Sequence, residues 1–122
     1  MALQHARFLE AIDLAAPEPI GSSSTSSSLL KTGQMQVMRL VLPAGHALPE
    51  HHVPGEITIQ CLSGEADVTT PHASCRLAPG QLVALPAAEP HAVHANEAST
   101  LLVTVVRIQA NGLPSTSQGD LP

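Results

Sequence analysis

The sequence predicts an all-β fold, an antiparallel sandwich or barrel built as one domain. Its 122 residues are enough for a single core but not for two. Eleven prolines and eight glycines punctuate the chain every few residues, a pattern typical of short strands joined by tight turns. From Leu29 onward no stretch of helical length interrupts the strand-like segments. Such a run of short strands favours an antiparallel β architecture over mixed folds.

Residues 1–28 are expected to form an N-terminal arm and a linker. Within residues 2–15 the apolar side chains recur near helical spacing, and Pro17 stops the pattern. This segment is predicted to be a short helix or an arm that packs on the barrel or on a partner subunit. Residues 21–28 read Gly-Ser-Ser-Ser-Thr-Ser-Ser-Ser, and this low complexity predicts a mobile linker.

Residues 29–110 are predicted to form the β domain. Short segments rich in Val, Leu, Ile or Thr, separated by Gly and Pro turn signals, mark its strands. The predicted strands are residues 29–31, 35–42, 57–62, 65–70, 74–77, 81–85, 91–95 and 100–108. The remaining residues, 111–122, are polar and rich in Pro, Gly and Ser, and are expected to form a flexible tail.

The composition argues against several classes of partner. The formal net charge is −5 with only five Lys and Arg, whereas nucleic acids and anionic membranes need a basic surface. No run approaches the roughly 18 apolar residues of a membrane span. The apolar N-terminus is broken by charged residues, so it is not expected to be a secretory signal. Two cysteines, Cys61 and Cys75, fit free thiols in a reducing compartment, and we expect a cytoplasmic protein.

Two glycine-led histidine segments carry the strongest functional signal. The first runs from Gly45 through Glu50-His51-His52 to Glu56, and the second runs from Gly80 to Pro90-His91. Imidazole and carboxylate groups are the usual protein ligands of a divalent first-row metal. Two such segments in one short β-rich chain therefore predict a metal-binding β domain.

The first segment resembles the first sequence motif of the cupin superfamily. That motif reads Gly, five residues, His-x-His, three or four residues, Glu, about six residues and Gly. Here Gly45 is followed by five residues and His51, and Glu56 lies eight residues before Gly64. The His-x-His signature itself is interrupted, because the chain reads Glu-His-His-Val at this point.

Two alignments of this signature are possible. Counting forward from the first glycine makes His51 the first motif histidine and puts Val53 in the second position. Counting back from the glutamate makes His52 the second histidine and puts Glu50 in the first position. A bulge at Pro54-Gly55 could reconcile the two counts. Which of His51 and His52 is the ligand, and whether His46 takes part, stays open.

The second segment resembles the second cupin motif, which reads Gly, five residues, Pro-x-Gly, two residues, His, three residues and Asn. Gly80, Pro86 and His91 are in register, Ala88 replaces the inner glycine, and Asn96 lies one residue late. The resemblance covers residues 29–108 and implies a small single-domain cupin with a jelly-roll barrel, a double-stranded β-helix. Barrels of this superfamily commonly pair, so the resemblance also implies a homodimer.

The resemblance implies that His51, His52, Glu56 and His91 hold a divalent transition metal: Fe, Mn, Ni, Co or Zn. The barrel lumen would then take a small-molecule ligand beside the open metal positions.

Strand alternation predicts which side chains face this lumen. If Glu56 points inward, Thr58 and Gln60 follow it into the pocket, and the stripe Ile57-Ile59-Cys61 faces outward. An outward apolar stripe would need cover, which also favours a homodimer. In the second segment an inward His91 places His94 on the outside.

The sequence leaves two functions open, besides a purely structural barrel whose histidines have lost their metal. One is a metal-dependent dioxygenase, isomerase or decarboxylase acting on a small molecule in the lumen, as the resemblance implies. The other is a non-catalytic barrel that binds or senses a small ligand, favoured by the interrupted His-x-His. No general acid or base stands out beyond the metal ligands, because the chain has no Tyr or Trp and only one lysine, Lys31.

Overall fold

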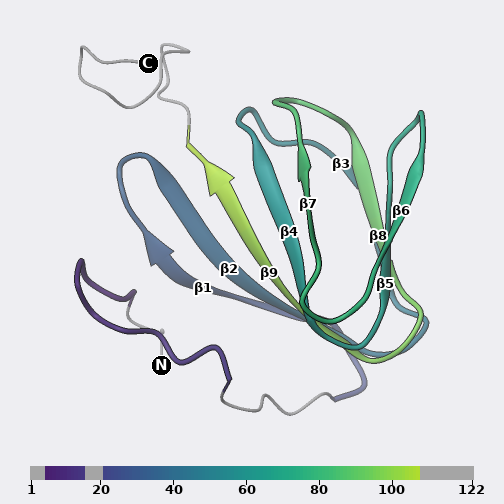
Figure 1. Cartoon of the computed structure of the whole chain (residues 1–122), viewed down its shortest axis with the longest axis horizontal. Helices are drawn as coiled ribbons and strands as arrows, with labels where there is room; N and C mark the ends of the chain where they lie inside the picture. The colour runs from purple at the N-terminus through teal and green to yellow at the C-terminus, as the bar shows by residue number, and fades with distance from the viewer. Residues whose placement is uncertain (1–4, 16–20, 108–122) are drawn as a thin grey trace.

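A computed structural model describes residues 5–15 and 21–107 of the chain. In these ranges the structure has nine antiparallel strands and no helix, arranged as two facing sheets (Figure 1). The five-stranded sheet has the order β1-β2-β9-β4-β7: Thr25–Lys31, Met35–Leu42, Ser99–Val106, Ile57–Ser63 and Leu82–Leu85. The four-stranded sheet has the order β3-β8-β5-β6: Ala47–His51, His91–Ala95, Ala66–Thr69 and Ser74–Leu77. The predicted all-β jelly-roll architecture is confirmed.

A single hydrophobic core fills the space between the two sheets. Strands alternate, so each sends every second side chain inward, as Ile57, Ile59 and Cys61 of β4 show with at most 5% exposure. Both sheets contribute to the same cluster: Leu42, Ile57, Ile59, Cys61, Ala66, Val68, Leu77, Leu85, Val93, Ala95, Leu101 and Val103. Burial also raises the pKa of the Cys61 thiol. This core is aliphatic because the sequence offers almost no aromatic residue.

The glycines of the two sequence motifs form left-handed turns. Gly45, Gly64 and Gly80 have φ angles of 83°, 86° and 89°. Gly64, between β4 and β5, is also crowded, because an added Cβ would meet the carbonyl oxygen of Ala98 and the side chain of Ser99. Ala88, which replaces the inner glycine of the second motif, adopts the same left-handed region with φ 64°.

The N-terminal segment is an arm and not a helix. Residues 5–15 contain no helix, and the amide of Ala6 donates to the carbonyl of Leu29 on β1 at 2.9 Å. Farther along, the Arg39 guanidinium on β2 donates to the carbonyl of Asp13 at 3.1 Å. The arm therefore lies beside the β1 edge (Figure 1), and its later part is bonded to the outward-facing Arg39 of β2.

The predicted linker over residues 21–28 is only partly a linker, because β1 begins inside the serine run at Thr25. Ser26 pairs with Leu40 and Ser28 with Met38. Pairing of this kind uses main-chain groups, which every residue except proline supplies in full, so low complexity did not prevent a strand. The predicted tail, residues 111–122, lies outside the described residues.

Strand β3 is absent from the predicted set, although it carries the first histidine motif. Its sequence, Ala-Leu-Pro-Glu-His, contains a proline and lacks β-branched residues. It pairs with β8 at an edge of the four-stranded sheet, and its register shifts between Leu48 and His51. Proline is tolerated at such an edge because one side of the strand donates no ladder hydrogen bonds.

Candidate functional site

The first and second histidine segments meet at one pair of rings. His51, the last residue of β3, is the direct partner of His91, the first residue of β8. Their ring centroids lie 4.4 Å apart with the planes tilted by 57°. His91 is 1% exposed whereas His51 is solvent-exposed, so the pair joins the protein interior to the surface.

Main-chain hydrogen bonds fix the tautomer of both rings. The Nδ1 of His51 lies 3.1 Å from the carbonyl oxygen of Pro49, and the Nδ1 of His91 lies 2.9 Å from that of Glu89. A carbonyl oxygen only accepts, so each Nδ1 carries the proton and donates it. In the neutral ring each Nε2 then presents a lone pair, which can accept a proton from a ligand or bind a metal ion.

A cavity of about 360 Å³ opens beside His51. It lies between β1 and β2 on one sheet and β3 on the other, with Leu40, Leu42 and Leu48 as its apolar wall. Its hydroxyl-bearing rim is Ser24, Thr25 and Ser26. We call this the lumen cavity; it falls in the size range of small-molecule sites.

The serine rim was missed by sequence reasoning, because the serine run was interpreted as a linker. The side chain of Ser24 in this rim is held by a hydrogen bond, because its hydroxyl lies 3.2 Å from Nδ1 of His46. His46 is in turn held at its main chain, where its carbonyl accepts from the amide of Ala95 at 2.9 Å. His46 therefore orders the rim of the lumen cavity. The only available signal was the β-favourable threonine inside the run.

The other two predicted metal ligands do not join the histidine pair. His52 is exposed beyond the end of β3, and Glu56 is exposed at the start of β4. Across residues 5–15 and 21–107, no three His, Cys, Asp or Glu side chains lie together in a group able to hold a metal ion. The inward position nearest Glu56 belongs to Ile57, which is 5% exposed and part of the core. The structure therefore brings together His51 and His91, but not all four of the residues that the resemblance implies as ligands.

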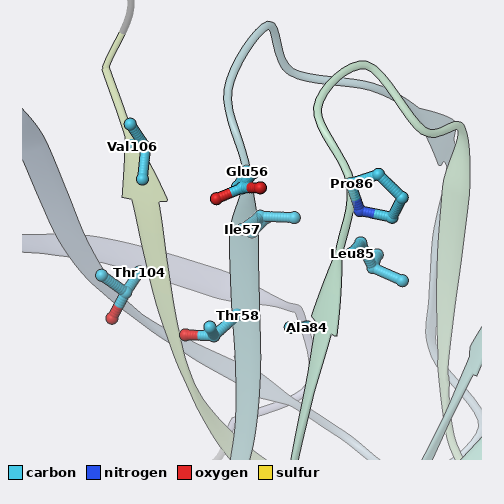
Figure 2. A pocket seen from close by; sticks show the side chains of 8 residues that line it. All are labelled: Glu56, Ile57, Thr58, Ala84, Leu85, Pro86, Thr104 and Val106. Atoms are coloured by element: carbon cyan, nitrogen blue, oxygen red, sulfur yellow. The ribbon is translucent and has the colours of Figure 1, made fainter. Parts of the chain in front are cut away.

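The inward facing predicted for Thr58 and Gln60 is wrong, because β4 presents the opposite residues to the core. Figure 2 shows Thr58 and Thr104 directed to one side of the sheet and Ile57 and Leu85 to the other. The apolar stripe Ile57-Ile59-Cys61 that was expected outside is thus the centre of the core. Because this stripe is buried within one protomer, it does not support a homodimer.

Thr58 instead lines a second hollow, of about 410 Å³, on the outer face of the five-stranded sheet (Figure 2). We call it the outer groove. It runs over β9, β4 and β7 and is lined by Glu56, Ile57, Thr58, Ala84, Leu85, Pro86, Thr104 and Val106.

The prediction for the second segment holds, because His91 faces inward and His94 is exposed on the outer face of β8. His94 belongs to a polar network on that face, where its Nδ1 lies 3.0 Å from Oδ1 of Asn96. In the same network the Arg76 guanidinium donates to Asp67 at 2.9 Å and lowers the pKa of that carboxyl. The network joins β5, β6 and the end of β8, and none of its residues lines the lumen cavity.

The jelly-roll fold agrees with the comparison of the sequence with known families. The family described as the cupin domain matches residues 38–107, and the chain belongs to this family. Comparison with curated proteins gives no match. The described part of the chain contains no helix long and apolar enough to cross a membrane.

Several solved structures are similar to this chain. A conserved protein of unknown function from Streptococcus pyogenes is 28% identical, with 90% of this chain and 97% of that chain covered and a TM-score of 0.75. A cupin superfamily protein from Desulfitobacterium hafniense is 20% identical, with coverages of 87% and 98% and a TM-score of 0.73. KdgF from a Halomonas species is 16% identical, with coverages of 79% and 91% and a TM-score of 0.65. The last two likenesses concern the fold alone.

Proposed function

We propose that this cupin is a non-catalytic binding protein that holds a small molecule in the lumen cavity. The observation that carries the proposal is the fixed tautomer of His51, which directs an Nε2 lone pair away from its main-chain partner beside a cavity of about 360 Å³. In this role His51 contacts the ligand, and the buried His91 packs against its ring and holds its orientation.

The chemistry of the lining defines the class of ligand. An Nε2 lone pair accepts a hydrogen bond, so the ligand should carry a hydroxyl or another O–H or N–H donor at this end. The hydroxyls of Ser24, Thr25 and Ser26 can donate or accept along its side. Leu40, Leu42 and Leu48 suit an aliphatic portion. A small amphipathic hydroxylated molecule meets all three requirements.

Metal-dependent catalysis, the other function considered from the sequence, needs more donors than this pair. Two imidazoles occupy only two coordination positions of a transition metal, so water or a chelating ligand must fill the others. Their Nδ1 hydrogen bonds are the kind of support that ligating histidines have, so the pair itself is suited to a metal. A dioxygenase, isomerase or decarboxylase would therefore depend on a chelating substrate to complete its centre.

The test is elemental analysis combined with a ligand screen, using protein purified without a histidine tag. Wild type, His51→Ala and His91→Ala are compared, with His94→Ala as the matched control because His94 lies on the outer face of the same strand as His91. Metal content is measured before and after reconstitution with Fe(II), Mn(II), Ni(II), Co(II) and Zn(II). Thermal shifts with a panel of small aliphatic hydroxy acids, diols and polyols are then recorded in EDTA.

The proposal predicts substoichiometric metal in every sample, and at least one compound that stabilises wild type and His94→Ala but not His51→Ala. Near-stoichiometric metal that disappears in His91→Ala but not in His94→Ala would replace the proposal with the metal-dependent one. Stabilisation that is equal in all four proteins would place the ligand elsewhere and contradict the role of His51.

We further propose that the protein acts in the cytoplasm as a homodimer. Both cysteines are free thiols, buried Cys61 and exposed Cys75, which supports a reducing compartment. Large apolar side chains remain exposed on one protomer, among them Phe8, Leu9 and Leu82 at 81%, 107% and 56%. Such exposure supports a second copy as cover. Fractionation of the native host and light scattering on the purified protein test these two statements.

A further inference from the structure

Three of the five Lys and Arg residues of the chain lie at one corner of the molecule, where the N-terminal arm meets the turn between β1 and β2. Arg7 belongs to the arm, and Lys31, the only lysine of the chain, ends β1. The guanidinium of Arg107, the residue after β9, donates to the carbonyl oxygen of Thr32 in that turn. In a chain with a formal net charge of −5, this corner therefore stands out as locally basic.

A hollow of about 500 Å³ opens at this corner, between the arm and the β1–β2 turn. We call it the arm hollow; its lining consists of Ala6, Arg7, Phe8, Leu30, Lys31, Thr32 and Gly33. Arg7 and Lys31 are the charged members of this lining, and none of its described members is acidic. Phe8 and Leu30 add an apolar wall. The arm hollow thus combines positive charge with apolar surface.

Both sides of the arm hollow are held in place by hydrogen bonds. On the arm side, the amide of Ala6 donates to the carbonyl of Leu29 on β1 at 2.9 Å. On the turn side, the amide of Thr32 donates to the carbonyl of Met35 at 2.8 Å, and the Thr32 hydroxyl accepts from the amide of Met35 at 3.1 Å. The hollow is therefore formed before a ligand arrives, which reduces the entropic cost of binding.

The turn of the arm also contains one carboxylate, that of Glu10. It accepts from the main-chain amide of Arg7 at 2.8 Å, and Glu10 does not line the arm hollow. In the part of the chain that the structure describes, no carboxylate lies within ion-pair distance of the side chains of Arg7 or Lys31. The exposed Arg76 of the other sheet differs in this respect, because it pairs with Asp67 at 2.9 Å. The charges of Arg7 and Lys31 are therefore available to a ligand.

We propose that the arm hollow binds a small organic anion. Its phosphate or carboxylate head lies between Arg7 and Lys31, and its apolar or aromatic part packs against Phe8 and Leu30. A guanidinium presents paired donors that match two oxygens of either head group, and the ammonium adds a compact positive charge. An aromatic ring on the ligand would gain a ring contact with Phe8 beyond its buried area.

This site is separate from the lumen cavity. The lumen cavity is lined by Ser24, Thr25 and Ser26 at the start of β1, whereas Leu30 and Lys31 lie at its end. At about 3.3 Å per residue, Ser26 and Leu30 are roughly 13 Å apart along the strand. Binding of the anion should therefore not depend on His51.

The test is isothermal titration calorimetry on the full-length protein at low ionic strength, in a buffer without phosphate or carboxylate. The probes are inorganic phosphate, phenyl phosphate and benzoate. Arg7→Gln and Lys31→Gln each remove one charge from the hollow. Gly33→Glu adds an acid there, at a position with open space and no positive φ, so the fold should be retained.

Wild type should bind phenyl phosphate or benzoate with a dissociation constant below about 1 mM. Each of the three hollow variants should weaken this binding by about tenfold or more, as expected for loss of a charge-assisted contact. Arg76→Gln is the matched control, because it changes the net charge equally but on the other sheet. Arg76→Gln and His51→Ala should both bind as wild type does.

The single lysine gives a second readout. Acylation of the Lys31 amine can be followed by mass spectrometry of one peptide, because the chain has no other lysine. The probe that binds most tightly should slow this acylation in wild type and in Arg76→Gln, and should slow it much less in Arg7→Gln.

The comparison of probes identifies the head group, since the tighter of phenyl phosphate and benzoate names it. Inorganic phosphate that binds as tightly as phenyl phosphate would contradict the role of Phe8 and Leu30. The site itself would be overturned if none of the three anions bound wild type, or if binding were equal in wild type and the hollow variants. Binding lost equally in Arg76→Gln or in His51→Ala would place the anion elsewhere.

Discussion

Gly64, the last glycine of the first motif, is a position where both the backbone conformation and the packing require glycine. Its φ of 86° is strained for any residue with a side chain, and an added Cβ would contact the carbonyl oxygen of Ala98 and lie 2.7 Å from Cα of Ser99. These neighbours are held in place, because Ser99 is fully buried and accepts from the amide of Glu65 at 3.0 Å.

Gly64→Ala should therefore lower the free energy of unfolding by about 2 kcal/mol or more, combining a left-handed conformation with a steric clash. Gly33→Ala is the control, since Gly33 has open space around its Cα and no positive φ. That change should be neutral or slightly stabilising. Chemical denaturation of both variants measures the difference, and equal midpoints would contradict the assigned role of Gly64.

At the scale of single elements, β4 supplies the clearest prediction, because its two faces differ in environment. Ile59 is 1% exposed in the core, whereas Gln60 is half-buried on the outer face. Ile59→Ala should cost about 2–5 kcal/mol, the range for large-to-small changes in a packed core. Gln60→Ala should change stability by no more than about 0.5 kcal/mol. Urea unfolding of the two variants tests the facing of the strand; a larger loss for Gln60→Ala would reverse it.

The same element shows where sequence reasoning succeeded and where it failed. Strand alternation correctly predicted that His91 faces inward and His94 outward, because β8 is a regular strand and the count of alternating residues begins at His91 itself. For β4 the count began at Glu56, on the assumption that this carboxylate faces inward. The glutamate lies one residue farther from Gly64 than in the family motif, so Ile57 takes the inward position. A one-residue offset reverses every side chain of a strand, which a single sequence cannot detect.

Strand β3 illustrates a second limit. The motif predicted that His51 and His91 belong to one site, and they do form a pair with ring centroids 4.4 Å apart. The strand that places His51 there has weak β propensity, and its order comes from pairing with β8. Of the two motif histidines, His51, which the count forward from Gly45 favours, lies opposite His91, while His52 lies beyond the strand. The pairing of β3 with β8 therefore determines which of the two histidines lies next to His91, which the local sequence does not.

At the scale of the whole molecule, stability should be highest in the strands that have a partner on each side. Strand β9 pairs with β2 over its full length and with β4 from Thr100 to Val105, and it buries Leu101 and Val103 at 0% and 3% exposure. Strand β8 holds the equivalent inner place in the four-stranded sheet, between β3 and β5. Breaking the hydrogen bonds of β9 or β8 requires the core between the sheets to open, so their amides should exchange only through global unfolding.

The edge strands β1 and β3 should open locally at a lower free energy, since each has one strand partner and an exposed or half-buried inner face. Native-state hydrogen exchange measured by NMR tests this ordering. Amides of β9 and β8 should share one free energy equal to that of global unfolding, within the range of about 5–15 kcal/mol for domains. Amides of β1 and β3 should exchange at least about tenfold faster, a difference of about 1.4 kcal/mol. Because these two edges border the lumen cavity, a ligand bound there should slow exchange in β1 and β3 and leave β9 unchanged, whereas uniform protection in all four strands would contradict this separation.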